Sequence, residues 1–144
     1  GRRVLDLFAG TGQLGIEALS RGAASAVFVE KRRDAANLIR ENLKLTELTA
    51  RARVVGGEAE AFLAGCRERF DLIFLDPPYA AGLLEGALEM ISRFDILANH
   101  GIMVCESPAE RELPDLPAPY SKHRVYHYGK TRITTYHREE DVER

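Results

Sequence analysis

An apolar segment near the start of the chain runs into a glycine-rich turn and then into a helical pattern. The segment Val4–Phe8 is followed by Gly10, Gly12 and Gly15, which fit the spacing G-x-G-x-x-G, and a helix is expected over about Gly15–Arg21. Glycine permits a tight turn and lets a ligand come close to the backbone. A strand, a glycine turn and a helix in this order constrain the chain to the first βα unit of a parallel sheet.

The rest of the chain repeats this alternation of short apolar runs and helical stretches. Further strands are predicted at Ala26–Glu30, Ala52–Val55, Leu72–Leu75 and Ile102–Glu106. Helices are predicted near Arg33–Lys44, with Ala36, Leu38, Ile39 and Leu43 inside, at Ala59–Cys66, and at Leu83–Phe94, with Leu84, Leu88 and Ile91 at helical spacing. After an irregular connection, Pro108–Pro119, two strands at about Arg124–Tyr128 and Arg132–His137 are expected to form an antiparallel hairpin turned by Gly129-Lys130. The pattern predicts the α/β class: an open sheet, mostly parallel with a C-terminal antiparallel hairpin, and helices on both faces.

Two acidic residues accompany the glycine-rich turn. Asp6 lies inside the first strand, where a buried charge is costly unless it has polar partners such as a backbone turn or a ligand ammonium. Glu30 ends the second strand, twenty residues after Gly10, where an acid can hold ribose hydroxyls. The glycine pattern alone leaves a nicotinamide dinucleotide and other adenosine-containing ligands open. Asp6, which would repel a pyrophosphate, and the lack of Lys or Arg in the turn favour the cationic ligand S-adenosylmethionine.

The tetrapeptide Asp76-Pro77-Pro78-Tyr79 directly follows the apolar run Leu72–Leu75. The carboxyl end of a parallel strand is where open α/β sheets bind ligands. Neither proline has an amide hydrogen and each fixes φ, so the backbone carbonyls here are held in place and free to accept hydrogen bonds. Together with the Asp76 oxygens and the flat face of Tyr79, these acceptors suit a nucleobase with an exocyclic amine. The tetrapeptide has no evident role in hydride transfer.

At these residues the chain resembles the RsmD family, class I methyltransferases that methylate the exocyclic amine of a guanine in bacterial small-subunit ribosomal RNA. The resemblance covers the whole chain and rests on the run Asp6–Ala23, on Glu30, on Asp76–Tyr79 and on the late Tyr128–Thr131. The first motif is specific to the family. The tetrapeptide is shared with many amino methyltransferases that act on DNA or RNA, so the identity of the substrate rests on the resemblance.

The resemblance implies S-adenosylmethionine as cofactor, S-adenosylhomocysteine as product and ribosomal RNA as partner, naked or within an assembling small subunit. It implies no metal. The catalytic residues implied are Asp76, Pro77, Pro78 and Tyr79, and the cofactor-binding residues are Asp6, Phe8, Ala9, Gly10, Gly12, Glu30, Lys31, Glu58 and Ala59. The family usually has Asp-Ala where this chain has Glu58-Ala59, so an adenine contact and a solvated helix start are equal alternatives for Glu58. For Lys31, a solvated charged face is the alternative.

Length and composition predict one domain. The chain has 144 residues, of which 45% are hydrophobic, enough for one sizeable core. Its formal net charge of −2 is unusual for a protein that binds RNA, and it begins almost on the first strand. We therefore expect residues 1–144 to be a methyltransferase core that lacks an N-terminal segment present in the family; a naturally short protein is the alternative. A monomeric, cytoplasmic protein with reduced Cys66 and Cys105 is expected, without a membrane segment.

Two other functions stay open at this stage. An adenine-specific amino methyltransferase acting on DNA or RNA would use the same tetrapeptide at residues 76–79. From a different class, the chain could be a nucleotide-binding module without catalysis, which the intact tetrapeptide argues against. Nucleoside analysis of a methylated product separates the first alternative from guanine methylation, and cofactor calorimetry addresses the second.

Overall fold

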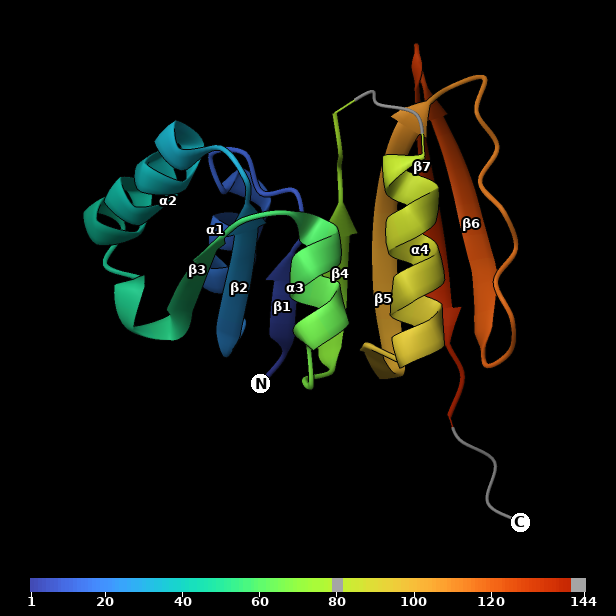
Figure 1. Cartoon of the computed structure of the whole chain (residues 1–144), viewed down its shortest axis with the longest axis horizontal. Coiled ribbons are helices and arrows are strands. Elements are labelled where there is room, and N and C mark those ends of the chain that lie inside the picture. Colours follow the sequence, from blue (N-terminus) through green and yellow to red (C-terminus); the bar gives the residue numbers. More distant parts are fainter. Residues whose placement is uncertain (79–81, 141–144) are drawn as a thin grey trace.

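In the computed structural model, which describes residues 1–78 and 82–140, short strands and helices alternate along most of the chain (Figure 1). The strands are β1 (Arg3–Asp6), β2 (Ser25–Glu30), β3 (Ala52–Gly56), β4 (Phe70–Leu75), β5 (Leu97–Pro108), β6 (Tyr120–Tyr128) and β7 (Thr131–Arg138). The α-helices are α1 (Gln13–Ser20), α2 (Arg33–Leu45), α3 (Ala59–Gly65) and α4 (Leu83–Phe94), and a short 3-10 turn, Thr49–Arg51, precedes β3. Among the described residues, no helix has the length and apolar character needed to cross a membrane.

All seven strands belong to one sheet with the order β3-β2-β1-β4-β5-β7-β6. The pairs from β3 to β5 are parallel, and β7 lies antiparallel between β5 and β6. The order reverses between β1 and β4, so the carboxyl ends of these two strands flank a topological switch point, where open α/β sheets bind their ligands. The predicted parallel sheet, finished by an antiparallel hairpin, is confirmed.

Both faces of the central parallel strands β1, β2 and β4 are covered, each by its own helices. Neighbouring residues of one strand enter opposite clusters: Leu5 packs with the α3 and α4 side, whereas Val4 packs with the α1 and α2 side. The first cluster includes Val27, Val29, Leu63, Leu84, Leu88 and Ile91, and the second includes Ala26, Phe28, Leu19, Ile39 and Leu43. In Figure 1, α3 and α4 lie in front of the sheet and α1 lies behind it. Burial on two faces explains why these central strands are mostly apolar, without a regular alternation of polar and apolar residues.

Several predicted boundaries differ from the observed ones. β1 ends at Asp6, and Leu7 and Phe8 already belong to the turn, although the Leu7 amide still donates to the Phe74 carbonyl at 3.1 Å. β5 begins at Leu97 and β6 at Tyr120, both several residues earlier than the hydrophobic pattern indicated. The early part of β6 is polar, yet its backbone pairs with β7, because ladder hydrogen bonds do not require apolar side chains.

The inner face of α2 was predicted with one error. Ala36, Ile39 and Leu43 are buried as expected, but Leu38 is 44% exposed, so its predicted inner position was wrong. Ala35 is buried in its place. The small side chain of Ala35 lets the helix lie close to the sheet, and periodicity alone favours the larger apolar residue.

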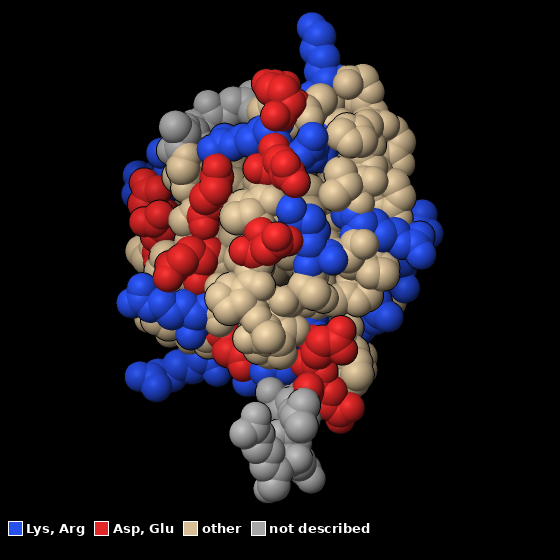
Figure 2. All heavy atoms as spheres, turned by 90° about the vertical axis from the view of Figure 1, so that its right-hand side faces the viewer, with Lys and Arg blue, Asp and Glu red and all other residues tan. Residues whose placement is uncertain are grey.

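Charged side chains of both signs alternate on the face beyond β6. Figure 2 shows Lys and Arg interleaved with Asp and Glu on this face, without one continuous basic area. This agrees with the formal net charge of −2. Lys122 of β6 is largely buried and donates to the Leu113 carbonyl, with Glu112 and Asp115 at 4.0 and 3.9 Å, so it is held by the connection that precedes its own strand.

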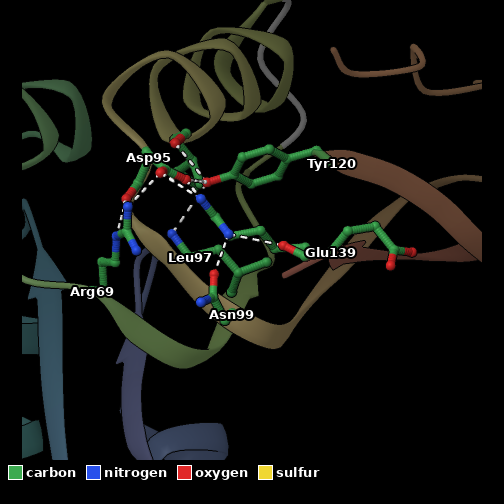
Figure 3. Close-up of polar contacts among 8 residues, drawn as sticks. Arg69, Asp95, Leu97, Asn99, Tyr120 and Glu139 are labelled. Carbon is green, nitrogen blue, oxygen red and sulfur yellow. Dashed lines mark hydrogen bonds and ion pairs between the residues drawn. The ribbon is translucent and has the colours of Figure 1, made fainter. Parts of the chain in front are cut away.

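A polar network at the opposite end of the sheet from the glycine-rich turn ties the antiparallel hairpin to α4 (Figure 3). Asp95, which follows α4 with φ of 56°, accepts two hydrogen bonds from the Arg138 guanidinium, from Nε at Oδ1 and from Nη2 at Oδ2, both at 2.7 Å. The Tyr120 hydroxyl donates to Asp95 Oδ1 at 2.8 Å, and Arg69, the residue before β4, reaches Asp95 Oδ2. Arg138 also contacts the Asn99 side chain and the Glu139 carbonyl. Residues from β6, from β7 and from the segment before β4 therefore meet at the carboxylate that follows α4.

In this network the positive charge of buried Arg138 is paired with the negative charge of Asp95. Arg138 is 2% exposed, and its hydrogen bonds are the main reason that the pKa of Asp95 lies below its ordinary value. Burial, together with the hydrogen bond to Asp95, raises the pKa of Tyr120, which stays a neutral donor. Because the pKa of Asp95 is lowered, its contribution to stability is present at neutral pH and is lost in acid.

Replacing Arg138 by Met is expected to lower the free energy of unfolding by about 2–4 kcal/mol, because Asp95 loses its bidentate partner while retaining Arg69. The matched control is Arg93→Met, which removes an exposed pair with Glu89 and should cost less than about 1 kcal/mol. Urea unfolding of both variants measures the difference. Equal losses would show that the buried network does not hold the hairpin.

Candidate functional site

A cavity of about 340 Å³ opens at the carboxyl ends of the parallel strands, beside the switch point between β1 and β4. Its wall combines residues from four strand ends and from the start of α4: Leu7, Phe8, Gly10, Val29, Glu30, Lys31, Arg32, Gly57, Glu58, Ala59, Glu60, Asp76, Pro78 and Leu83. The volume lies within the range typical of small-molecule sites. The cavity is therefore a candidate binding site built from segments that are far apart in the sequence.

The glycine-rich turn forms one wall of this cavity. Gly10 and Gly12 have φ of 58° and 84°, in the left-handed region that side chains with a Cβ avoid. A Cβ added to Gly10 would meet no atom within 4 Å, so open space lies next to this backbone. Gly15 serves packing instead, because a Cβ there would lie 2.3 Å from Cε2 of Phe28. The absence of a side chain at Gly15 thus allows α1 to approach β2 closely.

Two carboxylates hold the turn in place. The Gly15 amide donates to Asp6 Oδ2 at 3.1 Å, and the Gly10 amide donates to Glu30 Oε1 at 2.8 Å. The second oxygen of Glu30 accepts from the Arg32 amide at 2.9 Å. The predicted partner of Asp6, a backbone turn, is therefore present. Glu30 also fixes the backbone, and its oxygens have further lone pairs for a ligand.

Four carboxylates end four neighbouring strands at this edge of the sheet. Asp6 ends β1, Glu30 ends β2, Asp76 follows β4, and Glu106 lies near the end of β5. In the part of the chain that the structure describes, none of the four forms an ion pair with Lys, Arg or His. This edge therefore suits a ligand that carries positive charge.

The pKa values of two of these acids are raised, chiefly by burial and further by the proximity of the other acids. Burial raises the pKa of Asp6 to about 7, against the Gly15 hydrogen bond, and the charges of Asp76 and Glu30 raise it further. Asp6 is 3% exposed. Asp76 keeps an exposed surface at the cavity rim, yet partial loss of solvent and, after it, the neighbouring Glu106 raise its pKa to about 6. A cation at this edge would relieve both effects.

Lys31 and Glu58 face each other on the outer wall. Their side chains lie 3.8 Å apart and both are more than half exposed. Glu58 precedes α3 but makes no side-chain hydrogen bond to its first turn. Ala59, the next residue, is buried. Glu58 is therefore not engaged as a helix cap, and its carboxylate borders the cavity.

The structure brings most of the predicted site residues together. Six of the nine predicted cofactor residues line the cavity, namely Phe8, Gly10, Glu30, Lys31, Glu58 and Ala59. Asp6, Ala9 and Gly12 do not line it, but their hydrogen bonds hold the turn in shape. Asp76 and Pro78 line the cavity, Pro77 is half-buried beside them, and Tyr79 lies outside the described residues. No cluster of metal-ligating side chains occurs among residues 1–78 and 82–140.

Sequence reasoning missed some wall residues. Leu7, Val29, Arg32, Gly57, Glu60 and Leu83 line the cavity without having been predicted there. Most of them adjoin predicted positions, so the end-of-strand rule could have included them. The same rule identifies Glu106, an acid after an apolar strand, but its closeness to Asp76 becomes visible only through the pairing of β4 with β5.

Comparisons with known proteins agree with this geometry. A family model described as "Conserved hypothetical protein 95" matches residues 1–137. Ribosomal RNA small subunit methyltransferase D of Escherichia coli (strain K12) is 39% identical over 135 residues, which is 94% of this chain and 68% of the relative. The Bacillus subtilis (strain 168) protein YlbH is 41% identical over 139 residues, covering 94% of this chain and 76% of that protein. A solved structure of a conserved hypothetical protein from Streptococcus pyogenes has a TM-score of 0.89 at 40% identity, covering 96% of this chain and 87% of that one.

Asp6→Asn is expected to change how stability depends on pH. The raised pKa means that folded Asp6 keeps its proton up to about pH 7, whereas the unfolded chain loses it near pH 4. As the pH rises from about 4 to about 7, the wild type should therefore lose stability. The side-chain amide of the variant does not titrate and still accepts the hydrogen bond from Gly15, so the stability of the variant should not change in this way. Urea unfolding from pH 4 to pH 8 should show a stability difference that grows by roughly 2–4 kcal/mol in favour of the variant. A difference that does not vary with pH would contradict the raised pKa.

Proposed function

This chain belongs to the RsmD family of methyltransferases, and we propose that it transfers a methyl group from S-adenosylmethionine to the exocyclic amine of a guanine in small-subunit ribosomal RNA. The observation that carries the proposal is that Asp76 and Gly10 of the glycine-rich turn line the same cavity. The relatives named above support ribosomal RNA as the substrate class. The single core domain, a monomeric state and a cytoplasmic location are parts of the same proposal.

The residues of the cavity fit S-adenosylmethionine. Space next to the Gly10 backbone admits a ligand. Lys31 and Arg32 also line the cavity, but they pair with Glu58 and Asp34, and none of the four strand-end acids forms an ion pair among the described residues, which favours a ligand with sulfonium and ammonium groups. When bound, this cofactor supplies an electrophilic methyl group. We assign Phe8 and Gly10 to contacts with the methionine end, and Asp6, Ala9 and Gly12 to the turn that positions them. Glu30 is assigned to the ribose hydroxyls, and Lys31, Glu58 and Ala59 to the adenosine side.

The tetrapeptide after β4 is assigned to the target base. The guanine amine is a poor nucleophile because its lone pair is delocalised into the ring. Asp76 and the Pro77 carbonyl would accept from its two N–H groups, which favours a pyramidal nitrogen with a localised lone pair. Pro77 and Pro78 fix the backbone that positions these acceptors. Stacking of the base on Tyr79 belongs to the proposal and concerns a residue outside the described part.

Access to this site requires an unpaired nucleotide. Asp76 follows β4 at the rim of the cavity, and the exocyclic amine of a guanine inside a helix cannot reach such a position. The target is therefore flipped out or already single-stranded. Transfer then depends mainly on orientation and on electrostatic stabilisation of developing charge.

The basic residues of the β6–β7 hairpin offer limited phosphate contacts. Lys122 is held by Leu113, Glu112 and Asp115, whereas Arg124 and Lys130 are exposed. Because charges of both signs are mixed on the face shown in Figure 2, few phosphate groups should be neutralised there. We therefore expect the affinity for RNA to depend only weakly on salt concentration. The shape of the RNA and the fit of the target base then carry more of the recognition.

Nucleoside analysis tests the proposed function. The protein is incubated with labelled S-adenosylmethionine and either small-subunit ribosomal RNA, assembling small subunits or duplex DNA, and the digested product is identified by mass spectrometry. N2-methylguanosine in ribosomal RNA is expected. N6-methyladenosine would establish the adenine-specific alternative, and the absence of methylated product on all substrates would leave a nucleotide-binding module.

Glu30→Ala is expected to weaken the binding of S-adenosylmethionine by about 1.5–3 kcal/mol, because charge-assisted bonds to the ribose and the Gly10 anchor are both lost. Glu41→Ala on the exposed face of α2 is the matched control and should bind normally. Isothermal titration calorimetry measures both affinities. An unchanged affinity in Glu30→Ala would remove this residue from the cofactor site.

Asp76→Ala should cut the single-turnover rate of methyl transfer by roughly two to four orders of magnitude while leaving cofactor affinity nearly unchanged. The reason is that Asp76 contacts the target amine, whereas the Gly10 turn and Glu30 hold the cofactor. Rapid-quench transfer assays and cofactor calorimetry on the same preparation separate the two effects. Lost cofactor binding together with normal transfer at saturating cofactor would reverse the assignment.

A further inference from the structure

Glu106 lies beside Asp76 at the carboxyl ends of two adjacent parallel strands. Leu75 of β4 is in register with Cys105 of β5, so the next residues along the two strands, Asp76 and Glu106, emerge side by side. Neighbouring strands are about 4.8 Å apart, and residues in register point to the same face of a sheet. Glu106 is also paired with Ile133 of β7, which holds its backbone on the other side. Two strands thus fix the place of Glu106, and Asp76 stands at the rim of the cavity.

The two carboxyl groups interact directly. The strand register brings the side chains close enough for a proton on one carboxyl group to be shared with the other, and the negative charge of Glu106 disfavours ionisation of Asp76. No Lys, Arg or His forms an ion pair with either of them within residues 1–78 and 82–140, so no cation of this part of the chain compensates two negative charges. Other charged groups that face Asp76 are Asp6 on β1 and, across the cavity, Glu30, Lys31, Arg32, Glu58 and Glu60.

Such a pair binds one proton more tightly than a lone carboxylate does. Two neighbouring carboxyl groups cannot both ionise freely, so the protons leave in two separate steps that belong to the pair. Partial burial and Glu106 together raise the pKa of Asp76 to about 6. A carboxylate with a raised pKa is a stronger base near neutral pH than an ordinary aspartate.

We propose that Glu106 is a positioning residue that acts through Asp76: it makes Asp76 a stronger proton acceptor, and the two carboxyl groups hold between them the proton that the methylated amine gives up. This inference rests on the proposed function. The amine nitrogen forms the new N–C bond with its lone pair, and the electrons of the broken S–C bond stay on the sulfur of the donor. The N–H proton moves to the ionised Asp76 oxygen, is shared with Glu106, and leaves to water when the product departs.

The first test needs neither cofactor nor RNA. Carbon-13 NMR of the side-chain carboxyl groups follows the titration of Asp76 in the wild type, in Glu106→Gln and in Glu110→Gln, an exposed acid near the same strand end that serves as control. Glu106→Gln removes the neighbouring charge and supplies an amide donor, so the Asp76 midpoint should fall by at least one pH unit, a tenfold change in proton affinity. Glu110→Gln should leave it unchanged. An Asp76 midpoint that does not move in Glu106→Gln overturns the proposal.

The second test measures the single-turnover rate of methylation against pH. In the wild type the rate should fall as the pH drops below about 6, where Asp76 becomes protonated. In Glu106→Gln this acid limb should move to lower pH, and the plateau rate should drop by roughly two- to tenfold, far less than in Asp76→Ala. A purely structural role for Glu106 would lower the rate without moving the limb and would overturn the inference. Wild-type protein that transfers no methyl group to ribosomal RNA would overturn the proposed function and this role with it, whereas normal wild-type transfer with an unmoved limb overturns the role of Glu106 alone.

Discussion

The glycine-rich turn is held from two sides by carboxylates, and the geometry of the site depends on these hydrogen bonds. Asp6, at the end of β1, accepts from the Gly15 amide in the first turn of α1. Glu30, at the end of β2, accepts from the Gly10 amide. Gly10 and Gly12 adopt left-handed backbone conformations, which glycine populates without the steric cost of a Cβ. Because both anchors come from strand ends, the turn is fixed relative to the sheet, and the cavity wall is formed before any ligand binds.

The same anchors bring acids together that repel one another. Parallel strands end at one edge of the sheet, so Asp6, Glu30, Asp76 and Glu106 meet there although they are spread over a hundred residues of sequence. The raised pKa values of Asp6 and Asp76 show that this arrangement costs folding free energy at neutral pH. A positively charged ligand recovers part of that cost, which makes the edge of the sheet selective for such a ligand over a phosphate compound.

The antiparallel hairpin supports the site from a distance. Arg138, Asp95 and Tyr120 join β7, the end of α4 and β6 at the end of the sheet that lies away from the cavity. β7 in turn pairs with β5 from Ile102 to Pro108, which includes Glu106. A salt-bridge network at one end of the sheet thereby holds the strand whose other end carries an acid of the site.

The sequence by itself determined the order of the strands and helices and most of the site residues that it predicted. Short apolar runs with polar ends predict buried parallel strands, and the glycines after Val4–Phe8 and the tetrapeptide after β4 mark ligand-binding ends, because these signals are local. Only the tertiary structure decided the exposure of Leu38, the pairing of Arg138 with Asp95, 43 residues away, and the contact of Glu106 with Asp76. These three depend on strand register and on packing between distant segments. No periodicity within a short window of sequence carries that information, since register is set by the whole sheet.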